Sequence, residues 1–182
     1  MDDSARRALL KLARETLQAH LEGRPPPEPV DPVPEAAFGG LFVTLHRAGR
    51  LRGCIGQFRA GRGPAGAVRE MAVAAAHDPR FASNPVTARE LPEIDIEISV
   101  LSEPQPVKDP LALVPGVHGI IVRRGTRSGC FLPQVATEQG WNMEQMLNHC
   151  CEGKAGLPPD AWRQPGTEVL AFTAEVFGER TA

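Results

Sequence analysis

The stretch LRGCIG at residues 51–56 carries the most distinctive chemistry of the sequence, because it places a cysteine between two glycines and two residues after an arginine. In a regular strand, residues i and i+2 project to the same face, so Arg52 and Cys54 are expected to be neighbours. A nearby guanidinium favours the thiolate, the nucleophilic form of cysteine. Gly53 and Gly56 would leave room for a substrate beside the sulfur. The stretch therefore predicts a reactive thiol or, more simply, a packed cysteine that behaves as a small hydrophobic side chain.

A nucleophilic cysteine usually needs a base, and histidine is the commonest one. His118 is the first candidate, because the sequence GVHGI gives it glycine neighbours similar to those of Cys54 at the start of an expected strand. The alternative for His118 is a structural role in a turn. His46 lies on the strand expected to pair with that of Cys54, but the sequence does not give the pairing register. His77 and His149 are the remaining candidates, and His77 at a helix end would also complement the helix dipole.

A second cluster of charged residues occurs in HDPRF, residues 77–81. Asp78 and Arg80 could bind a substrate together, or they could cap and brace a turn. The sequence GRGPAG at 61–66 formally matches a nucleotide-binding glycine pattern, but no parallel βαβ pattern supports it. Neighbouring cysteines on a helix point about 100° apart, so the Cys150–Cys151 pair rarely binds one metal. We expect no metal site and no cofactor.

The overall composition is that of a globular protein with 42% hydrophobic and 23% charged residues. A formal net charge of −2 argues against nucleic-acid binding as the main function, since there is no basic excess to neutralise phosphates. No segment approaches the roughly 20 apolar residues that cross a membrane, and the N-terminus lacks the features of a signal peptide. We therefore expect a cytoplasmic protein whose four cysteines stay reduced.

The expected elements mix helices and strands without a regular βαβ repeat. Helical spacing of leucines predicts a helix over 4–22 with Ser4 as its N-cap, and a proline-rich strap over 24–35 packed on the same domain. Residues 40–58 read as a β-hairpin that turns at Ala-Gly, and 93–102 alternate as a half-buried strand. The fold class is therefore α+β, with a mixed, largely antiparallel sheet and flanking helices in a single domain over residues 1–182.

Several of these stretches occur together, and in the same order, in one protein family. The stretches are GLFVTL, LRGCIG, AAAHDPRF, ELPEIDIEISVL, GVHGIIV, FLPQVATEQGW and KAGLP. The chain resembles the AMMECR family over roughly residues 5–178, and LRGCIG matches the signature of that family. It is similar to the bacterial and archaeal type, protein A of the AmmeMemoRadiSam system.

The resemblance implies a fold of two subdomains with the signature at an accessible cleft near their junction. It implies association with a Memo-like protein and a radical SAM protein, but it names no reaction. By motif position it marks Arg52, Gly53, Cys54, Gly56, Asp78, Arg80, Phe81, His118, Pro133 and Gln134. Cys54, His118 and Arg52 are then the expected catalytic residues of an enzyme, and Gln134 joins the expected substrate-binding set. The alternatives are a non-catalytic adaptor that docks a protein through LRGCIG, and capture of a metal or cofactor by Cys54 with histidines.

Overall fold

The computed structural model describes residues 1–28, 38–58 and 63–180. The helices are α1 (Asp3–Leu21), α2 (Gly63–Ala76), α3 (Pro133–Gln139), α4 (Met143–His149) and the π-helix η4 (Cys150–Ala155). The strands are β1 (Gly40–Arg47), β2 (Arg50–Phe58), β3 (Ile94–Leu101), β4 (Gln105–Pro106), β5 (His118–Arg124), β6 (Arg127–Phe131) and β7 (Glu168–Gly178). Short 3₁₀ helices are η1 (Pro79–Phe81), η2 (Ala88–Glu93), η3 (Pro110–Ala112) and η5 (Ala161–Arg163). All strand pairs with a defined register are antiparallel, so the α+β class is confirmed.

The chain forms two compact units. The first comprises residues 1–101 together with 175–182, and the second comprises 102–174. Strand β7 contributes to both units, because its last residues return to the first unit.

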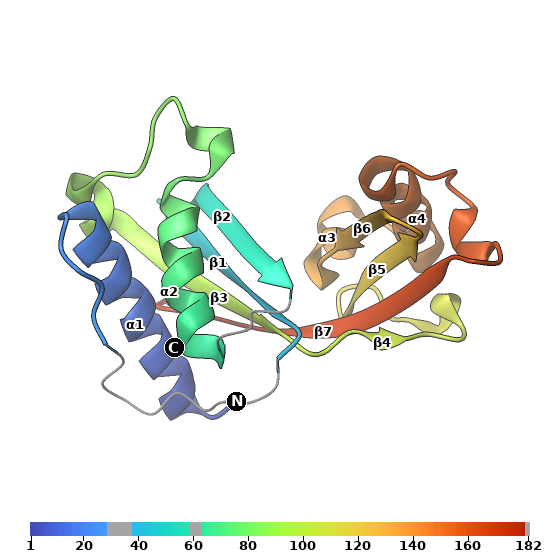
Figure 1. Ribbon diagram of the computed structural model, residues 1–182, viewed down its shortest axis with the longest axis horizontal. Coiled ribbons are helices and arrows are strands. Elements are labelled where there is room, and N and C mark those ends of the chain that lie inside the picture. Colours follow the sequence, from blue (N-terminus) through green and yellow to red (C-terminus); the bar gives the residue numbers. More distant parts are fainter. Residues whose placement is uncertain (29–37, 59–62, 181–182) are drawn as a thin grey trace. The chain divides into compact units, whose positions relative to one another are not determined.

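The first unit is a sheet in the order β2-β1-β3, with the end of β7 beside β3. The predicted hairpin is confirmed: β1 and β2 pair around a turn at Ala48 and Gly49, which both have positive φ. Helices α1 and α2 lie across one face of this sheet (Figure 1). Small residues of α2, such as Ala72 and Ala75, are fully buried and allow its close approach to the sheet.

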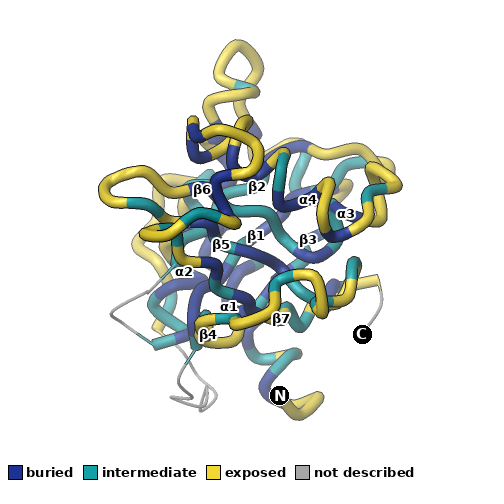
Figure 2. The backbone as a smooth tube through the Cα atoms, turned by 90° about the vertical axis from the view of Figure 1, so that its right-hand side faces the viewer, coloured by how far each residue is buried: buried dark blue, intermediate teal, exposed yellow. Residues whose placement is uncertain are grey.

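One hydrophobic core fills the space between this sheet and its helices. Leucines of α1, alanines of α2 and alternate residues of β1 and β3 line it, including Leu9, Leu17, Val43, Ile96 and Ile98. The alternation follows from the two-residue period of a strand, which sends every second side chain of β1 and β3 to the helix side. Figure 2 shows the dark buried stretches of these elements.

The N-terminal helix begins one residue earlier than the range 4–22 predicts and ends at Leu21. Asp2, rather than the predicted Ser4, is the N-cap, and its side chain accepts a hydrogen bond of 2.8 Å from the N–H of Ala5. An aspartate also suits the positive end of the helix dipole. The predicted strap over 24–35 lies for the most part outside the described residues, which resume at Phe38.

The second unit has its own sheet and its own core. Strand β5 pairs with β6 and with β7, and β4 pairs with β7. The core is built from Ile120, Val122, Met146, Leu147 and Trp162 with further apolar residues of the same unit. The stretch NMEQMLNHCCEGKAG begins α4, which continues into the π-helix η4.

Candidate functional site

The candidate site is the middle of β2, where Cys54 lies directly opposite Thr44 of β1. Cys54 points to the sheet face away from α2. Its neighbour Gly53 backs onto Ala75 of α2, and Ile55 packs on the helix-side core. The hydroxyl of Thr44 donates to the sulfur at 3.2 Å.

The backbone of Cys54 is held from outside the sheet by a single short segment. Strand β2 lies at the end of the strand order, so Cys54 turns its N–H and C=O away from β1. The N–H donates to Asp78 Oδ2 at 2.9 Å, and Arg80 Nη2 donates to the C=O at 3.1 Å. Together Asp78 and Arg80 take the place that a further strand would occupy at this residue.

Asp78 and Arg80 are also tightly joined to each other. The Asp78 carboxylate accepts hydrogen bonds from the N–H and the guanidinium of Arg80, with Nη2 to Oδ2 at 2.5 Å. The guanidinium and the two backbone N–H donors hold the pKa of Asp78 well below its usual range, against the effect of burial. The pKa of Arg80 is raised, mainly by the hydrogen bond to Asp78 and to a smaller degree by the side chain of Cys54. The predicted cluster is therefore real, and it braces the turn at the same time.

The predicted contact between Arg52 and Cys54 is not present. A β-bulge interrupts the register here: Leu45 pairs with Gly53 and His46 with Leu51, so Arg52 has no partner on β1. The guanidinium of Arg52 instead donates twice to Glu90, at 3.1 Å each, and is almost fully buried. The guanidinium next to Cys54 is that of Arg80.

The prediction that the two glycines open space beside the sulfur is also wrong. A Cβ at Gly53 would lie 2.0 Å from the carbonyl oxygen of Ala75, on the helix side of the sheet. A Cβ at Gly56 would lie 2.1 Å from the ring of Phe42, which is its cross-strand partner. Protein atoms fill both spaces, so the glycines serve close packing of β2. Their predicted part in substrate binding is untested.

His118 and Gln134 belong to the second unit. His118 is the first residue of β5, and its Nδ1 accepts a hydrogen bond of 3.0 Å from the N–H of Val114. That contact braces the preceding turn and agrees with the structural alternative for His118. Gln134 lies in the first turn of α3, next to the buried Pro133. The catalytic role of His118 and the binding role of Gln134 remain predictions.

The other three cysteines lie in the second unit, and all four cysteines of the chain are free. Burial raises the pKa of Cys130 and of Cys150 to about 12, and it also raises the pKa of Cys151. Among residues 1–28, 38–58 and 63–180, no group of three or more His, Cys, Asp or Glu side chains could hold a metal ion. Within the same ranges, no helix is both long and apolar enough to cross a membrane.

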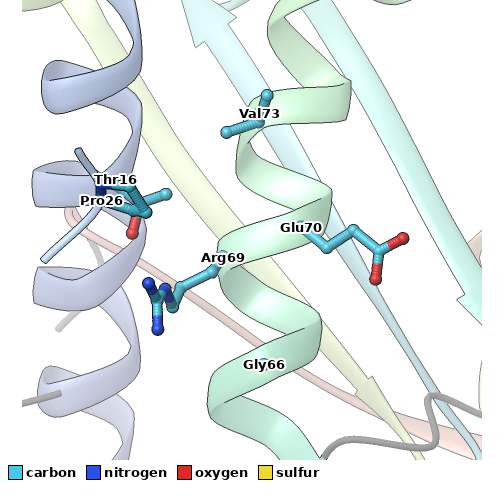
Figure 3. Close-up of a pocket in the computed structure, with 6 residues that line it drawn as sticks. All are labelled: Thr16, Pro26, Gly66, Arg69, Glu70 and Val73. Carbon is cyan, nitrogen blue, oxygen red and sulfur yellow. The ribbon is translucent and has the colours of Figure 1, made fainter. Parts of the chain in front are cut away.

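A separate pocket lies between α1 and α2 (Figure 3). It is lined by Thr16, Pro26, Gly66, Arg69, Glu70 and Val73. None of the predicted site residues contributes to it. Arg69 forms an ion pair of 3.6 Å with Glu28, which is almost fully exposed.

Sequence reasoning missed Thr44 and Glu90. The signal for Thr44 is its place in an alternating strand, but only the register of the hairpin brings it opposite Cys54. Glu90 binds Arg52 and Arg47 and also accepts from the N–H of Thr87. Because Glu90 lies 38 residues after Arg52, no local spacing joins the two.

Comparison with known proteins identifies the family of this chain. The AMMECR1 family model matches residues 10–177. A protein of Methanothermobacter thermautotrophicus is 43% identical over 95% of this chain and 93% of its own length. A protein of Methanosarcina barkeri is 39% identical over 99% of this chain and 93% of its own length. The crystal structure of the uncharacterized protein PH0010 from Pyrococcus horikoshii has a TM-score of 0.85 and 37% identity, covering 100% of this chain and 94% of its own. The chain belongs to the AMMECR1 family.

Proposed function

We propose that this protein is an enzyme, or an enzyme component, in which Cys54 is a reactive thiol. The observation that carries the proposal is the pair of groups at one cysteine: the Thr44 hydroxyl on the sulfur and the Arg80 guanidinium on the same residue. The hydroxyl contacts the sulfur itself, and the guanidinium contacts the backbone oxygen of the same residue.

The roles of the surrounding residues follow from their contacts. Asp78 holds the backbone of Cys54 and orients Arg80, and its own side chain is almost fully buried. The Arg80 side chain is 57% exposed, so its outer face is open to an anionic group of a substrate. Arg52 is a structural residue in this proposal, because its Nε and Nη2 both donate to Glu90 and its side chain is almost fully buried.

Alkylation by iodoacetamide tests the reactive thiol directly. If the proposal is right, Cys54 of the folded protein reacts at least about tenfold faster than glutathione at pH 7, because a nucleophilic cysteine reacts as its thiolate. Peptide mass spectrometry assigns the label to Cys54, and a Cys54→Ser variant gives the background. A rate equal to that of glutathione would refute the proposal.

The partners implied by the family resemblance are part of the same proposal. We expect the protein to act with a Memo-like protein and a radical SAM protein in the cytoplasm, and to copurify with them when they are produced together. Cys54→Ser should retain these partners but lose biological function. If Cys54→Ser keeps full function, the protein is an adaptor instead.

An adaptor that pairs its β2 edge with a partner strand is disfavoured at Cys54. Edge docking needs free backbone groups, and both of those at Cys54 are bonded to Asp78 and Arg80. Metal capture by Cys54 with histidines is the third possibility from the sequence, and metal analysis of the purified protein tests it.

A further inference from the structure

The pocket between α1 and α2 in the first unit has a volume of about 420 Å³ (Figure 3). This volume lies in the range of roughly 300–1,000 Å³ that is typical of small-molecule sites. Thr16 of α1 and Arg69 of α2 line the pocket from opposite sides, and Pro26 and Val73 add apolar surface. The pocket therefore combines a hydroxyl, a cation and an apolar wall.

The hydroxyl of Thr16 has no hydrogen-bond partner among the residues that the structure describes, although Thr16 is only 1% exposed. A buried hydroxyl without a partner costs free energy, because it has given up its hydrogen bonds to water. Such groups are rare in folded proteins, and each one calls for an explanation. In Figure 3 the Thr16 oxygen lies on the side of α1 that faces Arg69. A ligand group that accepts a hydrogen bond in this pocket would give the hydroxyl a partner.

The guanidinium of Arg69 has a weak partner within the described ranges. Its Nη1 lies 3.6 Å from Oε2 of Glu28, which is longer than a hydrogen bond. The Arg69 side chain is only 26% exposed, whereas that of Glu28 is almost fully exposed, and such a pair contributes little. Glu70 also lines the pocket, but its carboxylate turns to the other side of α2 and accepts from Gln57 of β2 at 3.4 Å. Arg69 is therefore open to a carboxylate that meets it with better geometry than Glu28.

We propose that this pocket binds a small organic carboxylate with a short apolar tail. The carboxylate replaces Glu28 on Arg69, because a planar guanidinium donates two parallel hydrogen bonds to such a group. The Thr16 hydroxyl donates to the same carboxylate, and the tail lies on Pro26 and Val73. The proposal does not depend on the reactive thiol, since none of the residues of that site lines the pocket.

A singly charged carboxylate fits the charge of the pocket better than a phosphate does. Among the described residues that line the pocket, Arg69 is the one cation. It balances one negative charge, whereas a phosphate dianion would leave a second charge without a partner in a partly buried place. The apolar wall favours a ligand with a hydrocarbon part, which a phosphate ion lacks.

Titration of the ¹⁵N-labelled full chain with acetate, butanoate and benzoate, each compared with its neutral amide, tests the proposal by NMR. Shifts of backbone amides of α1 and α2 around Thr16 and Arg69 locate the site. We expect butanoate and benzoate to bind with a Kd of about 1 mM or tighter. Acetate should bind more weakly because it lacks the tail, and each amide should bind at least about tenfold more weakly than its acid.

Three results of these titrations would overturn the proposal. The first is that none of the three acids shifts the amides around the pocket. The second is that an acid and its amide bind equally well, which would mean that the charge of Arg69 has no part in binding. The third is that inorganic phosphate binds there as tightly as benzoate, which would mean that the ligand class is wrong.

Variants of the pocket then assign the contacts, with benzoate as the probe. Arg69→Gln should raise the Kd at least about tenfold. Thr16→Val keeps the shape of the side chain and should raise the Kd several-fold without destabilising the fold, because the hydroxyl that it removes has no partner. Glu28→Gln should instead lower the Kd several-fold, because it removes the carboxylate that competes for Arg69. Arg123→Gln changes an exposed pair of the second unit and serves as the control, with a Kd within about twofold of wild type.

Two outcomes among the variants contradict the assignment. Weaker binding in Glu28→Gln would show that Glu28 does not compete with the ligand. Loss of binding in Arg80→Gln, with normal binding in Arg69→Gln, would place the acid beside Cys54 and overturn the site between α1 and α2. The amide spectrum of each variant shows whether it is folded, so a change in Kd is compared only between folded proteins.

Discussion

The carboxylate of Asp78 accepts a hydrogen bond of 2.9 Å from the backbone N–H of Cys54. This bond joins the turn after α2 to the edge of the hairpin and fixes the cysteine against movement along that edge. The same carboxylate holds the Arg80 guanidinium, so one buried side chain positions both the thiol backbone and the cation next to it.

Replacing Asp78 by alanine should destabilise the protein by about 2–3 kcal/mol, because it leaves the Cys54 N–H and Arg80 without their acceptor. Urea unfolding followed by circular dichroism measures the change. Glu168→Ala removes the partner of Arg123 in an exposed pair of the second unit and serves as the control. It should cost less than about 1 kcal/mol. Equal effects of the two changes would contradict the anchoring role of Asp78.

The contribution of Asp78 should depend on pH. The pKa of its carboxyl is lowered in the folded protein, chiefly by the Arg80 hydrogen bond, from about 3.9 in an unfolded chain. A lowered pKa stabilises the fold above the unfolded pKa, and this stabilisation is lost as the pH falls below it. The free-energy difference between wild type and Asp78→Asn should therefore be constant from pH 7 to about pH 5 and then shrink toward pH 3. If the free-energy difference between wild type and Asp78→Asn grew as the pH fell, the pKa of Asp78 would not be lowered in the folded protein.

Two arginine variants should separate stability from reactivity. Arg52→Gln breaks an almost fully buried pair with Glu90 and should cost about 3 kcal/mol, while Cys54 alkylation in the folded protein stays within about twofold of wild type. Arg80→Gln should have a smaller effect on stability, because its side chain is 57% exposed, but it should slow alkylation at pH 7 several-fold. Urea unfolding and alkylation rates provide the two readouts. Slower alkylation in a folded Arg52→Gln protein would show that Arg52 supports the reactivity of Cys54, as the sequence suggests.

Gly53 should tolerate no side chain. Alanine there would place its Cβ 2.0 Å from the backbone oxygen of Ala75, and backbone atoms of α2 have no easy way to move aside. We expect Gly53→Ala to cost about 3 kcal/mol in urea unfolding. Gly153→Ala is the matched control, because a Cβ at Gly153 meets nothing within 4 Å, and its effect should be within about 1 kcal/mol of zero. If Gly53→Ala left the free energy of unfolding unchanged, α2 would pack less closely on β2 than the structure shows.

Two strand-like stretches around an Ala-Gly turn were enough to predict the hairpin, and the alternation of residues 93–102 with the mixture of helices and strands was enough to predict the α+β class. The side of the sheet that Cys54 faces could be derived in the same way. The bulge beside Arg52 could not be derived in this way. It depends on which residue of β2 pairs with His46, and alternation within either strand does not give that register. For the same reason the partner of Arg52 could not be predicted, since Glu90 reaches it only through tertiary packing.

The glycines illustrate a second limit of local reasoning. Two glycines in one strand show that something must approach the backbone closely. They do not show whether the approaching group is a substrate, the Phe42 ring or the Ala75 carbonyl, because these come from different elements. The HDPRF segment was recognised as a cluster, but its hold on Cys54 depends on β2 being at the end of the strand order.

Of the four cysteines, Cys54 should be labelled first when the native protein is treated with iodoacetamide at pH 8. Burial raises the pKa of Cys130 and Cys150 to about 12, so almost none of either is thiolate at that pH, and Cys151 is fully buried with a raised pKa. Only the thiolate reacts, so these three should be labelled much more slowly than Cys54 until urea unfolds the chain. Peptide mass spectrometry before and after unfolding measures the order. Labelling of Cys130, which like Cys54 is half-buried, as fast as that of Cys54 in the folded protein would contradict this order.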